Sequence, residues 1–126
     1  MDKVDKNLFR SALNDLIMAQ KCMESQLLQT NIACYHCYQC AEKSLKGFLY
    51  LKLGHEPKSN NLTELLKLCI MQNIEFTGIT ELCEELMKYS TVSYDVDRID
   101  TKTALSIIND TQNIYDLCFS LLIENV

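Results

Sequence analysis

The feature that most constrains this chain is its shortage of residues that interrupt helices. Its 126 residues include only three glycines and one proline. A β-sandwich or barrel needs many tight turns, and glycine and proline usually mark them. Because long stretches lack both, we expect long helices joined by few loops. Hydrophobic residues make up 48% of the chain, enough to form the core of one domain over residues 1–126.

Apolar residues recur at three- and four-residue steps, and this spacing predicts amphipathic helices. The expected helices run from Val4 to Leu28, from about Asn31 to Leu53, from Leu62 to about Gln72, from Ile79 to Tyr89 and from Thr101 to about Glu124. The predicted fold class is all-α, an up-and-down helical bundle of four to five helices. The apolar stripe of the first helix is expected at Phe9, Leu13, Leu16, Gln20, Met23 and Leu27. That of the last helix is expected at Leu105, Ile108, Thr111 or Gln112, Tyr115, Cys118 or Phe119, and Leu122.

Residues that favour helix ends stand at the expected boundaries. Thr30-Asn31 offers an N-cap to the second helix, Gly54 a C-terminal cap, Asn60 or Asn61 an N-cap to the third helix, and Asp100 an N-cap to the last. We expect Gly78 to interrupt the helical pattern between the third and fourth helices. The stretch from residue 90 to 100 is predicted to be an irregular connection, in which alternating Val92, Tyr94 and Val96 give a weak strand signal.

The charge of the chain limits its partners. The formal net charge is −5 and the isoelectric point about 4.9, which argues against general DNA binding because that binding depends on Lys and Arg at phosphates. No apolar run is long enough for a membrane span. The N-terminal residues do not resemble a signal peptide, so we expect a cytoplasmic protein.

Three cysteines stand close together in the stretch CYHCYQC, residues 34 to 40, and three interpretations are open. The first is a metal site, but cysteines at three-residue steps on one helix form a stripe and do not surround one ion. A redox CxxC motif would require a preceding strand. The favoured interpretation is packing, since free cysteine is among the most buried residue types. We therefore expect no metal and no cofactor.

The residues from Tyr35 to Leu66 resemble the HEPN domain family, in which a helix of the form HAxQAAEKxLKAxL precedes a loop ending PKTHDL. The matching positions are His36, Gln39, Ala41, Glu42, Lys43, Leu45, Lys46, Leu49, Pro57, Lys58 and Leu62. Further on, Tyr89 and Tyr94 match a family segment Tyr-x-x-x-Arg-Tyr-Pro-Asp. The chain departs from the pattern at Asn60-Asn61, where the family has His-Asp, and at Ser93, where it often has Arg. It departs again at Val96 or Asp95, which replaces the family's Pro.

The resemblance implies a helical bundle that forms a homodimer. It also implies a nucleotide or phosphorylated small molecule as ligand and a small nucleotidyltransferase as partner, in some cases within a toxin–antitoxin pair. The ligand-binding residues implied are His36, Gln39, Glu42, Lys43, Lys46, Lys58 and Asn60. Lys43 and Lys46 would contact phosphate, Lys58 would close over it, and backbone N–H groups near Asn60–Leu62 would add anion donors.

Several of these residues also have a structural interpretation. Glu42 and Lys46 can form an intrahelical ion pair in solvent, His36 can make one hydrogen bond in the core or an interface, and Asn60 and Asn61 can be caps. Tyr35 and Tyr38 lie on both sides of the cysteine stripe, so the second helix has little polar surface. This suggests that the helix meets another subunit.

Two further functions remain open. Some family members are RNases with an Arg-x4–6-His motif, but neither Arg10 nor Arg98 is followed by a histidine at that spacing. An RNase would need a non-standard site, with His36 acting beside Lys43 or Lys46. The other alternative is a structural module whose only role is association.

Overall fold

The structure, a computed structural model, describes residues 3–24, 29–92 and 98–124. All regular secondary structure within these ranges is helical. The all-α prediction is therefore confirmed. Tyr94, Val96 and the proposed family segment around Ser93 lie outside the described residues, as do residues 25–28 at the expected end of the first helix. No helix in the described ranges is long and apolar enough to cross a membrane.

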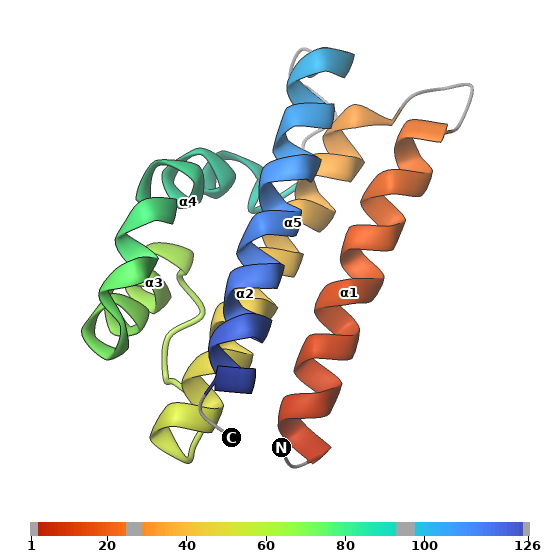
Figure 1. Ribbon diagram of the computed structural model, residues 1–126. Coiled ribbons are helices and arrows are strands. Elements are labelled where there is room, and N and C mark those ends of the chain that lie inside the picture. The colour runs from red at the N-terminus through yellow and green to blue at the C-terminus, as the bar shows by residue number, and fades with distance from the viewer. Residues whose placement is uncertain (1–2, 25–28, 93–97, 125–126) are drawn as a thin grey trace.

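Three long helices and a series of consecutive short helices form an up-and-down bundle (Figure 1). The elements are α1 (Lys3–Glu24), α2 (Thr30–Leu53), α3 (Leu62–Gln72), the 3₁₀ helix η1 (Ile74–Ile79), α4 (Thr80–Leu86), the 3₁₀ helix η2 (Met87–Tyr89) and α5 (Thr101–Glu124). The chain ascends along α1 and descends along α2. It ascends again through α3 and α4 and descends along α5, so that both ends of the chain lie at the same end of the bundle.

Helix α2 is the central element, because α1, α3, α4 and α5 all contact it. Its buried side chains occupy most of its circumference and include Cys34, Cys40, Leu45 and Phe48. Burial within the chain therefore explains the small polar surface of this helix. The small polar surface of α2 is therefore no argument for a subunit interface on this helix. Support for the expected homodimer has to come from another surface.

The buried stripe of α1 differs from the predicted one. Leu13 is 39% exposed and Gln20 is exposed, whereas Ala12, Asp15 and Ala19 are buried. The prediction weighted the larger apolar residues. The structure turns small ones toward α2, because small side chains allow two helices to approach closely. On α5 the prediction holds at Ile108, Thr111, Cys118 and Leu122, while Leu105 is exposed and Tyr115 half-buried. Buried Ala104, Ile107 and Ile114 complete the stripe.

Three predicted caps are present. Gly54 ends α2 in the left-handed region with φ 79°, and its N–H donates to the Tyr50 carbonyl. The Asn61 side chain accepts hydrogen bonds from the Thr63 and Glu64 N–H groups at the start of α3. Asp100 Oδ1 accepts from the Thr103 N–H at 2.7 Å at the start of α5.

Thr30 and Asn31 do not cap α2. The helix already begins at Thr30, and Gln29, in the cap position, makes no side-chain capping bond. The Thr30 hydroxyl donates instead to the Ile99 carbonyl at 2.6 Å, and the Asn31 side chain accepts from the Ile99 N–H at 3.0 Å. These polar groups thus fasten the start of α2 to the segment that leads into α5.

The helical pattern is interrupted between α3 and α4, as expected, but the interruption lies at Asn73 and not at Gly78. Gly78 lies within η1, which continues into α4 at Thr80. Helix α4 then runs into η2, so the predicted helix from Ile79 to Tyr89 is present as about two α-helical turns followed by a 3₁₀ turn.

The packing of α1 on α2 depends on Gly47. A Cβ at Gly47 would lie 2.7 Å from Phe9 Cε2 and 2.9 Å from Phe9 Cζ. The Phe9 ring cannot easily move away, because Tyr115 and Phe119 on α5 contact it edge-on at centroid distances of 6.2 and 6.0 Å.

Gly47→Ala is therefore expected to lower the free energy of unfolding by about 1–3 kcal/mol, because the added methyl overpacks the contact with Phe9. Gly78→Ala is the matched control, since nothing lies within 4 Å of a Cβ there. Urea denaturation measures both. Equal stability of the two variants would contradict the close approach of α1 and α2.

Candidate functional site

The cysteines belong to the core. All seven are free thiols, and Cys34, Cys37 and Cys40 are fully buried on α2. Burial raises the pKa of each of these three to about 12, so they are neutral thiols near pH 7. No group of three or more potential metal ligands occurs among the described residues. The packing interpretation of the CYHCYQC stretch agrees with this burial.

The predicted ligand residues on α2 lie on one stripe of the helix. At 100° per residue, positions 36, 39, 42, 43 and 46 fall within roughly 120° of the circumference. All five side chains are half-buried, in contrast to the buried residues on the other sides of α2. Between Cys34 and Leu49 of α2, the residues that are not fully buried all lie on this stripe.

A carboxylate from α1 occupies one end of this stripe. Asp15 Oδ1 lies 2.9 Å from His36 Nδ1, and Asp15 Oδ2 accepts a hydrogen bond from Lys43 Nζ at 2.6 Å. The Asp15 side chain is 12% exposed. Lys43 therefore has an internal counter-charge, and an anionic ligand at Lys43 would have to compete with Asp15.

Sequence reasoning missed Asp15, although a signal was available. Asp5, Phe9, Ala12, Leu16 and Ala19 are buried at helical spacing on α1. Asp15 falls in the same series, and an acidic residue within an otherwise apolar stripe requires a partner.

Lys46 is held in the same way at the other end of the stripe. Its Nζ lies 2.9 Å from Glu42 Oε1 and donates to the Asn60 side chain in the loop after α2. The Glu42 and Lys46 side chains are only 13% and 17% exposed, so their pair is not the solvated one expected. Glu42 also accepts a hydrogen bond from the Tyr38 hydroxyl. Burial is the main cause that raises the pKa of Tyr38, and the negative charge of Glu42 raises it further.

The remaining predicted residues are less constrained. Within residues 3–24, 29–92 and 98–124, the side chains of Gln39 and Lys58 form no hydrogen bond or ion pair. Lys58 is exposed on the loop between α2 and α3. The prediction that backbone N–H groups near residues 60–62 are open to an anion is not supported at Thr63 and Glu64, because the Asn61 side chain already binds both N–H groups.

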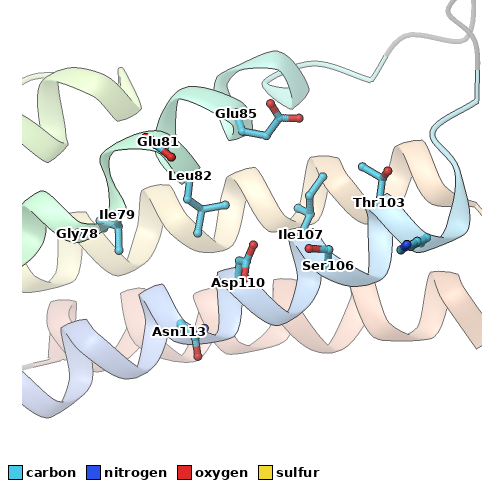
Figure 2. A pocket seen from close by; sticks show the side chains of 11 residues that line it. Gly78, Ile79, Glu81, Leu82, Glu85, Thr103, Ser106, Ile107, Asp110 and Asn113 are labelled. Carbon is cyan, nitrogen blue, oxygen red and sulfur yellow. The ribbon is translucent and has the colours of Figure 1, made fainter.

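A hollow of about 720 Å³ lies between α4 and α5 and was not predicted. Figure 2 shows Glu81, Glu85 and Asp110 among the side chains that line it, with Leu82 and Ile107. Hydrogen bonds from Lys88 and Tyr89 lower the pKa of Glu85, which keeps it charged. Three carboxylates against one lysine, Lys102, make this hollow unsuitable for phosphate.

The α2 stripe has the groups for proton transfer as well as for binding. Asp15 fixes the orientation of the His36 ring through Nδ1, which leaves Nε2 for another partner. Lys43 shares the same carboxylate. A histidine oriented by a carboxylate beside a lysine is an arrangement that acid–base catalysts use, although it also serves as a structural link between helices.

Comparison with known proteins gave two matches. The family model described as HEPN domain matches residues 6–122. The crystal structure of an archaeal HEPN homologue superposes with a TM-score of 0.74 at 23% sequence identity, covering 96% of this chain and 98% of the archaeal chain. A search of curated proteins found no match.

Asp15→Asn is expected to lower the free energy of unfolding by about 1–3 kcal/mol, because it removes the charge from hydrogen bonds with two cationic or polar partners. Asp116→Asn on α5 is the control, since Asp116 is exposed and accepts a hydrogen bond from Gln112 of its own helix. Thermal and urea denaturation measure both. If the two substitutions cost the same, Asp15 does not fasten α1 to α2.

The buried thiols predict a loss of stability in alkali. Below about pH 9 these thiols are protonated in both the folded and the unfolded chain. Between pH 9 and about 12 the unfolded chain releases protons that the folded chain retains, so the free energy of unfolding falls as pH rises. The double substitution Cys37→Ala with Cys40→Ala should reduce this slope. Urea titrations at pH 8 and at pH 10.5 measure it, and an unchanged slope would contradict the raised pKa values.

Proposed function

The chain belongs to the HEPN domain family, and from this premise we propose that it is a non-enzymatic, homodimeric protein that binds a nucleotide or phosphorylated small molecule. In this proposal it acts in the cytoplasm as the partner of a small nucleotidyltransferase, within a toxin–antitoxin pair. Seven free thiols are consistent with a reducing compartment.

One observation carries the proposal. Five of the seven ligand residues implied by the family signature share the polar stripe of α2, and a sixth, Asn60, is joined to that stripe through Lys46. The seventh, Lys58, lies in the same loop as Asn60. A family signature whose polar residues gather on one side of the bundle, while its apolar residues form the core, supports a ligand site on that side, where the α2 stripe meets the loop that precedes α3.

Homodimer formation is supported by a different surface. Large apolar side chains remain exposed on α1 and α5, among them Leu13 and Ile17 on α1 and Leu105 and Phe119 on α5. Phe9 on α1 contacts Phe119 on α5, so these helices adjoin. Exposed apolar residues on adjoining helices are typical of a surface that another subunit covers. Light scattering should give a mass twice the 14.5 kDa of the single chain.

An RNase is the second candidate, and the geometry at His36 favours it. The Asp15 carboxylate orients the His36 ring and holds Lys43 beside it. Cleavage of RNA by the purified protein, lost in His36→Ala, would replace the binding proposal with this one. The family motif Arg-x4–6-His is absent from the sequence, which is why binding is preferred.

The binding proposal predicts heat on titration with nucleoside mono-, di- and triphosphates in isothermal calorimetry. Because the family signature supplies lysines for phosphate, the unphosphorylated nucleoside should bind at least about tenfold more weakly, which corresponds to about 1.4 kcal/mol. Copurification with the nucleotidyltransferase encoded beside its gene tests the partner. Absence of heat with every nucleotide, together with no such neighbour, would leave association as the only function.

A further inference from the structure

Resting on the proposed function, we infer that the phosphorylated ligand binds in a hollow beside the loop between α2 and α3, and not on Lys43 and Lys46. Lys58 and Lys67 bind the phosphate in this inference. The apolar body of the ligand packs on Leu53, Pro57 and Leu68.

The hollow has the size and composition of a small-molecule site. Its volume is about 460 Å³, within the range of about 300–1,000 Å³ typical of ligand pockets. Leu53 ends α2, Pro57 and Lys58 belong to the loop, and Lys67 and Leu68 project from α3. Aliphatic walls beside cationic groups suit a molecule with an anionic end and an apolar or planar body, such as a mononucleotide.

The cations of this hollow differ from those on the α2 stripe. Lys43 and Lys46 are each bound to a carboxylate, at 2.6 and 2.9 Å. Lys58 and Lys67 are exposed and form no ion pair within the described ranges. A phosphate near Lys58 and Lys67 gains their charge without displacing an internal partner, whereas a phosphate at Lys43 would leave Asp15 unpaired.

The single carboxylate in the lining, Glu64, is hydrogen-bonded to another lining residue, Ser59. Glu64 accepts a hydrogen bond from the Ser59 hydroxyl, and the Ser59 Oγ accepts in turn from the Asn61 N–H at 3.0 Å. Two lysines against one glutamate give the lining a net positive charge in a chain of net charge −5. This sign contrasts with the acidic hollow between α4 and α5.

Several contacts hold the loop in the shape that forms the hollow. Gly54 is bonded to Tyr50, Asn60 accepts from Lys46, and Pro57 is buried. A preformed loop binds with a smaller entropy loss than a loop that orders on binding. Lys46 is accordingly a positioning residue that fixes the loop through Asn60.

His55 adds a directional group to the rim. Its Nδ1 lies 3.0 Å from the Glu56 carbonyl oxygen. Because a carbonyl oxygen only accepts, Nδ1 carries the proton, and Nε2 of the neutral ring is an acceptor. Because His55 lines the hollow, a hydroxyl of the ligand could donate to Nε2.

The test is calorimetry of the whole chain with a mononucleotide and with inorganic phosphate. The double substitution Lys58→Ala with Lys67→Ala should weaken mononucleotide binding at least about tenfold. Lys21→Ala with Lys102→Ala is the control, because it removes the same charge from exposed positions outside the hollow and should change affinity less than about threefold. Leu68→Ala should weaken the mononucleotide but not inorganic phosphate.

The outcomes separate this inference from the function on which it rests. If the wild-type chain binds and Lys43→Ala abolishes binding while the Lys58 and Lys67 double variant does not, the ligand lies on the α2 stripe and this inference is wrong. If the wild-type chain binds no phosphorylated ligand, the proposed function itself fails. Circular dichroism of each variant confirms that the bundle remains folded.

Discussion

The burial of α2 on most of its circumference is the constraint on which the rest of the structure depends. A helix enclosed by four others needs small or apolar residues on nearly every side, and CYHCYQCA supplies them with thiols and alanine. Because so little of α2 reaches solvent, its histidine, glutamate and lysine side chains between Cys34 and Leu49 lie on one stripe. The same enclosure forces their charges to find partners within the bundle.

Polar residues of this stripe link α2 to two neighbouring parts of the bundle. Asp15 connects α1 to α2, and Lys46 connects α2 to the loop that precedes α3. Both contacts employ residues of the HEPN signature, which shows that signature residues can maintain the architecture of the bundle. The lysines of the loop hollow, in contrast, form no ion pair within the described residues. An external anion can bind such lysines without displacing a carboxylate of the protein.

The sequence predicted the helices well, because Gly54, Asn61 and Asp100 act locally and their capping geometry involves only neighbouring residues. It predicted the core less well. Leu13 and Leu105 are apolar yet exposed, since residue size does not reveal which side of a helix a partner covers. Thr30 and Asn31 bind Ile99, almost seventy residues away, and such a contact leaves no mark in local sequence. Of the candidate site, the stripe on α2 follows from helical spacing, while Asp15 and Lys67 come from other helices and required the fold.

Phe9 and Gly47 are far apart in the sequence but adjacent in the structure, so the sizes of their side chains depend on each other. The ring of Phe9 occupies the space that a side chain at 47 would fill. A change at one of these positions is therefore acceptable only with a compensating change at the other: a smaller residue at 9 makes room for a Cβ at 47, and an aromatic ring at 9 demands glycine. Across related sequences, these positions should covary in size.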